Sequence, residues 1–589
     1  MRMNPPGRPG TTALLMLALL VTMLPVTALT VAPSSAAENW PMWRYDAQRS
    51  AASTNSLPDQ LQVLWKRQFA PRQSAWDDPL NHDLMSYDRI FEPVVMEGRL
   101  FIGFNDRGKL LAIDTSTGGD LWSAYAEAPV RLPAVAWKDQ VFFCSDDGFL
   151  YCVSATDGKL RWKFSGAPNP QKVIGNQRLT SAWPARGGPV VRDGSVYFAA
   201  SIWPFMGTFL YAIDAQTGAV QWVNDSTGAQ YIKQPHSAPS FAGIAPQGAL
   251  VATESTLIVP GGRSVPAVFD RHNGQLRYFE LNAGGKGTGG SFVTADDQHF
   301  FVHTRGKGTR AFDLATGLKT AFMPNEPVLA DGWIYAAEQD KQTPVVRAYR
   351  PDQTVAWQIA ADGQGDLILS DDKLIAAGEH VITCIRLPQG EQPAEVTLTI
   401  PTQTSVDRLL VADRKLFAVS VDGSVTAYGE TAERDPVPVR AATKGSAESL
   451  LLAAENDQQV AQELLATDNS EGYALWFGDC ESGVATSLAA NSPFVQFAIV
   501  DQDAGAIQRL RSRLDAADLL GKVTAHHSAA DAFRAPSYVA NAVFVAAELA
   551  ANADASLIAR LYRSVRPYGG VMHLLTGEHA EALASTGRL

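Results

Sequence analysis

The chain has 589 residues, of which 46% are hydrophobic, and carries a formal net charge of −12. This length exceeds what one ordinary hydrophobic core holds, so we expect two or more domains. The excess of acidic residues argues against nucleic acid, or any other polyanion, as a partner.

The first 37 residues have the pattern of a secretory signal. Arg2 and Arg8 precede the apolar run 13–24, and Ser34-Ser-Ala-Ala37 places small residues at the cleavage positions. We therefore expect residues 1–37 to be removed and the mature protein to be secreted or periplasmic. No later stretch is long and apolar enough to suggest a membrane span.

A short phrase then recurs along the chain. An apolar strand ends in Asp or Ser, a Gly follows four residues later, and an aromatic residue lies four or five residues beyond the Gly. The copies begin at Asp114, Ser154, Asp214, Asp270 and Asp313, and their aromatic residues are Trp122, Trp162, Trp222, Tyr278 and Phe322.

The chemistry of this phrase predicts a β-hairpin. The Asp or Ser side chain can accept hydrogen bonds from the turn that it opens, and Gly supplies the positive φ of the turn. We expect the aromatic residue to lie on the returning strand and to wedge against a neighbouring unit. A repeat of this kind predicts radially stacked blades.

Eight segments open a new set of strands at intervals of 34 to 61 residues, near positions 97, 139, 193, 254, 297, 331, 371 and 413. Each interval is close to the length of a propeller blade with four strands. The last set lacks a fourth strand, and Gln62–Phe69 has the pattern of the missing strand. The sequence thus predicts an eight-bladed, all-β propeller over residues 38–429, closed by its amino-terminal strand.

The four cysteines lie at 144, 152, 384 and 480, without a C-x-x-C motif. Cys144 and Cys152 flank a predicted hairpin turn. A disulfide across the hairpin and a pair of small buried thiols are both compatible with this spacing.

The recurring D-x-x-T-G-x-x-x-W phrase, together with the segment Trp40–Arg49 (WPMWRYDAQR), resembles the repeat of pyrroloquinoline quinone (PQQ)-type propellers. This family contains quinoprotein dehydrogenases, an outer-membrane assembly scaffold and other secreted proteins. A dehydrogenase of this family implies bound PQQ, a calcium ion, an Asp base and often a disulfide of adjacent cysteines. We find neither adjacent cysteines nor an acidic cluster to assign to calcium, so the sequence predicts no metal site and assigns no catalytic residue.

Two oversized intervals carry loops rich in Trp, Arg, His, Pro and Gly, as recognition loops on rigid scaffolds often are. Trp183 and Trp203 are predicted stacking surfaces, Arg186 and Arg263 predicted anion or sugar ligands, and His236 a further candidate. The alternative is that these loops only pack over the propeller.

Residues 430–448 are polar, contain two prolines and are predicted to be a linker. From 449 to 589 helix and strand patterns alternate, which predicts an open, mostly parallel α/β sheet. This region resembles a class I S-adenosylmethionine (SAM)-dependent methyltransferase of the Rossmann-like type. The resemblance rests on the turn 476–483, on Asp501 and Asp503 after the second strand, and on the loop 563–570.

The resemblance implies that Gly478, Gly483, Asp501 and Asp503 would line a SAM pocket. Asp479 and Glu481, however, stand where this family usually has glycines, and their side chains would obstruct the cofactor. The last two strands, usually an antiparallel pair, are also missing from the pattern. We therefore expect an incomplete domain that is catalytically silent.

We accordingly predict a non-catalytic binding or scaffold protein whose propeller face binds a protein, a peptide or a glycan. The alternatives are a PQQ-dependent oxidoreductase with calcium and a SAM-dependent methyltransferase.

Overall fold

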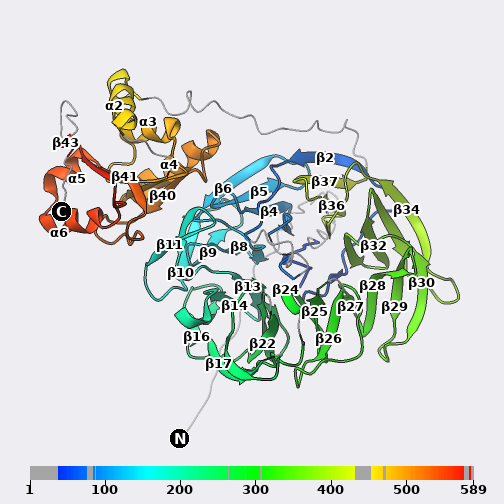
Figure 1. Ribbon diagram of the computed structural model, residues 1–589. Coiled ribbons are helices and arrows are strands. Elements are labelled where there is room, and N and C mark those ends of the chain that lie inside the picture. Colours follow the sequence, from blue (N-terminus) through cyan, green and yellow to red (C-terminus); the bar gives the residue numbers. More distant parts are fainter. Residues whose placement is uncertain are drawn as a thin grey trace, which may run out of the picture. The chain divides into compact units, whose positions relative to one another are not determined.

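The computed structural model describes residues 38–75, 84–86, 88–234, 236–262, 264–285, 287–305, 308–430, 453–467, 472–575 and 583–584. The predicted signal, most of the predicted linker and Arg263 lie outside these residues. Figure 1 shows a ring of β-sheets over residues 38–430 and a smaller α/β region in the carboxyl-terminal part.

Eight sheets form the ring, which confirms the predicted eight-bladed propeller. The first four blades consist of β3 (Val94–Met96), β4 (Arg99–Phe104), β5 (Lys109–Asp114) and β6 (Asp120–Tyr125); β7 (Val135–Trp137), β8 (Gln140–Cys144), β9 (Phe149–Ser154) and β10 (Leu160–Ser165); β13 (Gly187–Arg192), β14 (Ser195–Ala200), β15 (Phe209–Asp214) and β16 (Val220–Asn224); and β20 (Val251–Ala252), β21 (Thr256–Gly261), β22 (Ser264–Asp270) and β23 (Leu276–Tyr278).

The other four blades consist of β24 (Thr288–Ala295), β25 (His299–Thr304) and β26 (Thr309–Asp313); β27 (Val328–Ala330), β28 (Trp333–Asp340), β29 (Thr343–Tyr349) and β30 (Val355–Ala360); β31 (Asp366–Ser370), β32 (Lys373–Gly378), β33 (Val381–Arg386) and β34 (Glu395–Pro401); and β35 (Arg408–Ala412), β36 (Lys415–Val419), β37 (Ser424–Gly429) and β2 (Gln62–Gln68). In the last blade β2 pairs antiparallel with β37, so the predicted closure by the amino-terminal strand is confirmed.

The recurring turn behaves as its chemistry predicts. In the first copy, one oxygen of Asp114 accepts hydrogen bonds from the backbone N–H groups of Ser116 and Thr117, and Gly118 has a φ of 69°. In five blades the aromatic residue of the outer strand then packs on the turn glycine of the next blade. A Cβ at Gly158, for example, would lie only 2.5 Å from the Trp122 ring.

The same contact joins five pairs of neighbouring blades, and it includes Trp65 of the closing strand β2. The pairs are Trp65–Gly118, Trp122–Gly158, Trp162–Gly218, Trp222–Gly274 and Tyr278–Gly317. The turn glycines are therefore needed both for their positive φ and for the space that the aromatic ring occupies.

Residues 38–55, which we call the axial segment, contact the innermost strand of every blade. Backbone hydrogen bonds join its residues to Val95, Ala136, Ala252, Ala295, Leu329, Leu369 and Asp413, which belong to seven blades or to their first turns. The eighth blade is reached by the Arg49 guanidinium, which donates to the Pro189 carbonyl at 3.0 Å. β1 (Ala52–Ser53) of this segment also extends the sheet of β31 in parallel.

Arg49 is the most deeply buried charge of the axial segment, with no exposed surface. Besides Pro189, its guanidinium donates to the carbonyls of Leu250, Trp43 and Asp46. Burial lowers the pKa of Arg49 to about 9, while the nearby Asp46 charge acts in the opposite direction. A buried charge of this kind is tolerated because its hydrogen bonds are satisfied.

Two β-hairpins and one short turn lie outside the regular blades. These are β11 (Lys172–Gly175) with β12 (Arg178–Ser181), β17 (Ala229–Lys233) with β18 (Pro239–Gly243), and the 3₁₀ turn η2 (Pro204–Met206); β19 (Gly248–Ala249) adds to the edge of β13. The hairpins and η2 are inserted around the third blade, where the sequence shows its oversized intervals.

The thiols of Cys144 and Cys152 are free and buried. Cys144 lies opposite Leu150 and Cys152 opposite Phe142, so the two cysteines are not paired across the hairpin. Both belong to one apolar core, which agrees with the second of the two expectations for this pair.

The carboxyl-terminal region contains α2 (Glu455–Thr467), β38 (Tyr473–Phe477), α3 (Gly483–Asn491), β39 (Gln496–Asp501), α4 (Ala504–Ala516), β40 (Val523–His527), β41 (Ala540–Val545), α5 (Ala547–Asn552), α6 (Ala555–Tyr562), β42 (Val571–Leu574) and β43 (Leu583–Ala584). Five strands are parallel in the order β40-β39-β38-β41-β42, and β43 pairs antiparallel with β42. The expectation that no antiparallel strand lies at this edge of the sheet was therefore wrong, because β43 is a short antiparallel strand there.

Replacing Arg49 with alanine should destabilise the whole propeller. The substitution leaves the buried carbonyls of Leu250 and Pro189 without these donors, and each such loss costs about 1–3 kcal/mol. We expect Arg49→Ala to lower the free energy of unfolding by about 3 kcal/mol or more, measured by denaturant unfolding. Arg350→Ala, which removes an exposed arginine from the β29–β30 turn, is the matched control and should change little. Equal stability of the two variants would contradict a central role for Arg49.

Candidate functional site

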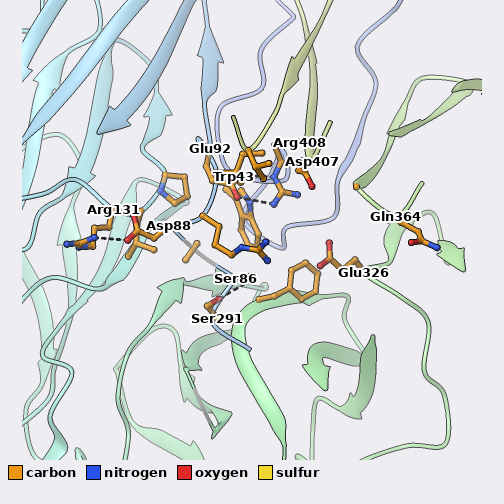
Figure 2. Close-up of a pocket in the computed structure, with 18 residues that line it drawn as sticks. Trp43, Ser86, Asp88, Glu92, Arg131, Ser291, Glu326, Gln364, Asp407 and Arg408 are labelled. Carbon is orange, nitrogen blue, oxygen red and sulfur yellow. Dashed lines mark hydrogen bonds and ion pairs between the residues drawn. The ribbon is translucent and has the colours of Figure 1, made fainter. Parts of the chain in front are cut away.

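A polar pocket lies at the ends of the innermost strands, around the propeller axis. Its volume is 180 Å³, and we call it the axial pocket. Figure 2 shows its labelled side chains, among them Trp43 of the axial segment and residues that precede β3, β7, β27, β31 and β35. The lining residues carry four carboxylates, Asp88, Glu92, Glu326 and Asp407, and three guanidinium groups, Arg89, Arg131 and Arg408.

Arg408 organises one side of this pocket. It makes a two-pronged ion pair with Glu92, with N···O distances of 2.8 and 2.9 Å, and lies 3.3 Å from a carboxylate oxygen of Asp366. Asp366 is also 3.8 Å from Arg44 of the axial segment. Burial raises the pKa of Glu92 and of Asp366, and the charge of Arg408 opposes both shifts.

Glu326 is held by a histidine. The Nε2 atom of His303 lies 2.7 Å from a Glu326 oxygen, and the imidazole stacks on Phe292 with ring centroids 4.7 Å apart. Burial would raise the pKa of Glu326, but the hydrogen bond to His303 and the charges of Arg408 and Arg44 hold it at about 2. His303 therefore fixes Glu326 in the pocket wall.

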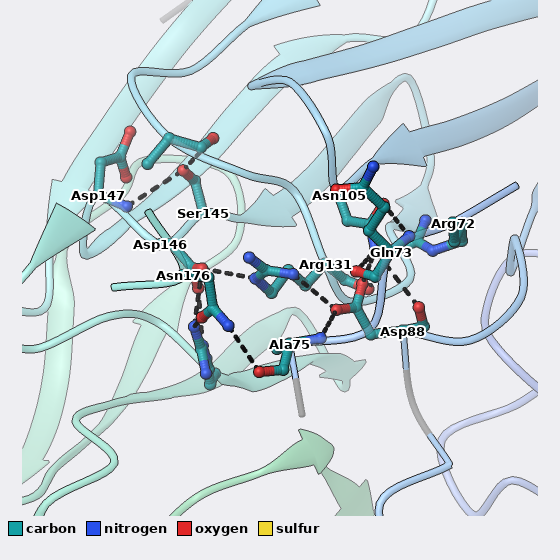
Figure 3. Close-up of polar contacts among 12 residues, drawn as sticks. Arg72, Gln73, Ala75, Asp88, Asn105, Arg131, Ser145, Asp146, Asp147 and Asn176 are labelled. Carbon is teal, nitrogen blue, oxygen red and sulfur yellow. Dashed lines mark hydrogen bonds and ion pairs between the residues drawn. The ribbon is translucent and has the colours of Figure 1, made fainter. Parts of the chain in front are cut away.

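The opposite side of the pocket ends in a row of alternating buried charges, drawn in Figure 3. The row runs Arg72–Asp88–Arg131–Asp146–Arg186, and its N···O distances lie between 2.6 and 2.9 Å. Burial would raise the pKa of Asp146, but the charges of Arg186 and Arg131 lower it to about 2. Asp88 additionally accepts a hydrogen bond from the backbone N–H of Ala75.

Asp407 is the one carboxylate of the axial pocket that the described residues leave without an ion pair. Its Oδ2 atom is buried and has no hydrogen-bond partner there, and the indole N–H of Trp43 is in the same situation. Burial raises the pKa of Asp407, with the charges of Arg408 and Arg89 acting against the shift. An acceptor and a donor without partners among the described residues thus lie in one pocket, where both are available to a hydrogen-bonding ligand.

The residues predicted to bind a ligand on the propeller loops differ in their exposure to solvent. Trp183 is buried, and its indole N–H donates to the Met206 carbonyl at 2.9 Å, so it anchors η2 instead of offering a stacking surface. Arg186 makes its ion pair with Asp146, inside the fold. Trp203 and His236 are exposed, as a binding role requires. Arg263 lies outside the described residues, so the structure describes two buried and two exposed residues of the predicted set.

In the carboxyl-terminal region the predicted SAM residues are used by the chain itself. The carboxylate of Asp501 accepts the backbone N–H groups of Cys480 and Asp503, both at 2.8 Å. Asp503 caps α4 by accepting from Gly505 and Ala506. A Cβ at Gly483 would lie 2.0 Å from Asp457 of α2, so helix packing explains this glycine. Gly478 has a φ of 95° and lies at the end of β38.

Sequence reasoning missed the axial pocket. Several of its charged residues lie within two residues of the start of the short apolar strand that opens a blade, as Glu92, Glu326 and Arg408 do. A search for charges at that position of each repeat would have found them. Their ion-pair partners come from other blades and leave no local pattern.

Two isosteric variants distinguish the roles of the carboxylates. Burial raises the pKa of Asp407, so its ionised form is disfavoured in the folded protein. Because Asp407→Asn removes this unpaired charge, we expect the free energy of unfolding at neutral pH to stay the same or to rise slightly. Asp88→Asn removes the shared partner of Arg72 and Arg131 and should cost about 3–5 kcal/mol. Denaturant unfolding of both variants provides the measurement. A loss of similar size in Asp407→Asn would show that Asp407 supports the fold instead.

The resident cofactors implied by the resemblances do not fit these residues. Three of the four pocket carboxylates are already bonded to arginine or histidine, and no three His, Cys, Asp or Glu side chains in the described ranges are placed to hold a metal ion. The volume of 180 Å³ is below the roughly 300–1,000 Å³ of typical small-molecule pockets. Asp501 and Asp503 already accept backbone hydrogen bonds, which argues against SAM binding as well.

Three kinds of similarity to known proteins accompany this geometry. A stretch of 142 residues is 30% identical to "Alcohol dehydrogenase (quinone), dehydrogenase subunit" of Gluconacetobacter polyoxogenes and covers 22% of this chain and 19% of that relative. The protein of the same name from Komagataeibacter europaeus is also 30% identical over 142 residues, at 22% and 18% coverage. The matched stretch spans about a fifth of the relatives' length.

Among solved structures, BamB from Moraxella catarrhalis is 13% identical, with 64% of this chain and 99% of that chain covered and a TM-score of 0.39. Quinohemoprotein alcohol dehydrogenase from Comamonas testosteroni is 12% identical, with coverage of 82% and 95% and a TM-score of 0.45. The PQQ_2 family model, described as outer membrane protein assembly factor BamB, matches residues 58–183, 134–359 and 210–477, more than half of the chain. The chain therefore belongs to the PQQ_2 family of repeat propellers.

Proposed function

We propose that this protein is a non-catalytic binding or scaffold protein whose axial pocket receives a polar group of a protein, peptide or glycan partner. The observation that carries the proposal is the charge pairing of the pocket. Asp88, Glu92 and Glu326 are held by arginine or histidine. Among the described residues this leaves Asp407 Oδ2, the Trp43 indole N–H and Nη1 of Arg408 as buried pocket groups without a hydrogen-bond partner.

The size and stiffness of the pocket also favour recognition. Its walls begin the innermost strands of the propeller and are connected to the axial segment through Trp43, so they are held by the whole ring. Rigid, preorganised walls lower the entropy cost of binding. A volume of 180 Å³ suits one side chain or one small polar group of a larger partner.

We place the protein outside the cytoplasm, secreted or periplasmic, because residues 1–37 have the composition of a signal. The helices that the structure describes include none that is long and apolar enough to cross a membrane. We assign the carboxyl-terminal sheet to an incomplete, silent Rossmann-like domain of the methyltransferase type. Its strand order and the engaged state of Asp501 support this assignment.

A PQQ-dependent oxidoreductase is the second candidate. The similarity to quinone alcohol dehydrogenases favours it, as does the raised pKa of Asp407, a property expected of a general base. The absence of a fitting cation site among the described residues and the small pocket argue against it.

A ligand titration separates these candidates. A ligand present at about 100 times its Kd stabilises its binding domain by roughly 2.7 kcal/mol, which shifts the melting midpoint by several degrees. We expect no shift when PQQ with calcium, PQQ with a lanthanide, or SAM is added to the protein, followed by differential scanning calorimetry. A shift with PQQ that Asp407→Asn removes would contradict the binding-protein proposal. A shift with SAM would show that the carboxyl-terminal domain is not silent.

A further inference from the structure

Four aromatic side chains are exposed on the insertions around the third blade. Trp203 and Phe205 of the η2 turn are 44% and 80% exposed, and Tyr231 and Phe241 of the β17–β18 hairpin are 64% and 78% exposed. We call these four residues the aromatic patch. Single exposed apolar side chains are ordinary, but neighbouring large ones indicate a contact surface.

The backbone register brings the four residues together. Tyr231 lies directly opposite Phe241 in the hairpin, and their rings are 5.2 Å apart. Gly243 is two residues beyond Phe241 and therefore faces the same side of β18. A Cβ there would lie 1.8 Å from Pro204, which stands between Trp203 and Phe205. The η2 turn thus packs on the very face of the hairpin that presents Tyr231 and Phe241.

The opposite face of the hairpin packs on the propeller, so the face with Tyr231 and Phe241 points outward. Ile232 and Ala242 alternate with the exposed aromatics and pack on the core of the third and fourth blades. The η2 turn is fixed from below by the buried Trp183, which donates to the Met206 carbonyl. The aromatic patch is therefore held rigidly and exposed, although its side chains are ones that usually lie inside a protein.

The charges around the patch are also unusual for this chain. Residues 194–213 and 226–253 contain no Asp or Glu, whereas the whole chain has 61 acidic residues in 589. Lys233 and His236 are the only basic side chains in these two stretches, and both belong to the exposed hairpin. The local charge of these stretches is therefore positive although the chain as a whole is acidic, and Asp193, Asp214, Asp225 and Glu254 lie at their borders.

We propose that the aromatic patch is a membrane-docking surface that inserts Trp203, Phe205, Tyr231 and Phe241 into the interfacial layer of a lipid bilayer containing anionic lipids. Trp and Tyr favour this layer because their rings have one apolar body and one polar tip. A glycan would instead require convergent polar groups in a concave site, whereas the polar side chains on the outward face of the described strands β17 and β18 are those of Lys233 and Tyr231. The surface is distinct from the axial pocket, so the inference extends beyond the proposed function.

Co-sedimentation with lipid vesicles tests the proposal. The probe is the compact unit 37–589, because it lacks the apolar run of the predicted signal, which could itself bind lipid. We expect binding to vesicles of phosphatidylethanolamine with phosphatidylglycerol, and weaker binding to phosphatidylcholine because of Lys233. Tyr231→Ser with Phe241→Ser should reduce the partition coefficient about tenfold, because the interfacial affinity grows with the apolar area buried.

Two exposed tyrosines of the carboxyl-terminal region provide the matched control. Tyr538 and Tyr568 are 65% and 99% exposed, and replacing both with serine should leave vesicle binding unchanged. The hairpin variant should keep its melting midpoint, because its substituted side chains face outward. The proposal is overturned if the parent protein does not sediment with vesicles, if the hairpin variant binds as well as the parent, or if the hairpin variant loses binding to insoluble glycan while the parent binds no vesicle.

Discussion

The rest of the structure depends on the hydrogen bonding of the axial segment. A propeller of eight blades has eight innermost strands around its axis, and their inner edges carry N–H and C=O groups that need partners. Residues 38–55 supply such partners to strands of all eight blades, and Arg49 supplies the donors where the segment backbone does not reach. The ring is therefore held from inside as well as by the contacts between neighbouring blades.

Two further contacts, both made by strand β2, stabilise the ring at its outer side. β2 completes the last blade by pairing with β37, and Trp65 of that strand packs on Gly118 of the first blade. The closing contact is thus the same one that the repeats use elsewhere. Because closure and axial filling both come from residues 38–68, one short stretch of sequence couples the first blade to the last.

The axial segment also determines what the axial pocket can do. Trp43 forms part of its wall, Arg44 pairs with Asp366, and the remaining charges are tied to one another across blades. A buried charge without a partner is costly, so a network this complete favours a fixed shape over an open metal site. Asp407 is the one pocket carboxylate without an ion pair among the described residues, and a functional role is expected at such a group.

The repeats of the sequence made the propeller predictable, because the turn of Asp114 and Gly118 and the wedge of Trp122 depend on local spacing. The number of blades and the closing strand followed from the same pattern. The axial segment was visible only as a distinctive string, since its irregular backbone follows no period. Arg186 and Trp183 had the composition of binding residues, but their partners, Asp146 and the Met206 carbonyl, are fixed by tertiary packing.

The carboxyl-terminal region likewise has features that local sequence predicts and features that depend on tertiary packing. The helices and parallel strands followed the apolar periodicity, whereas the use of Asp501 by two backbone N–H groups depends on how the turn after β38 folds. Gly483 illustrates the limit most plainly, because a glycine suited to a cofactor and a glycine suited to a helix contact with Asp457 look alike in sequence.

Hydrogen–deuterium exchange followed by mass spectrometry tests the central role of the axial segment most directly. If residues 38–55 hold all eight blades, their amides and those of Ala136, Ala252, Ala295, Leu329 and Leu369 should exchange together, with one free energy of opening close to that of global unfolding. Exchange of the axial segment that is far faster than exchange of the innermost strands would show that the ring is stable without it and would contradict the account.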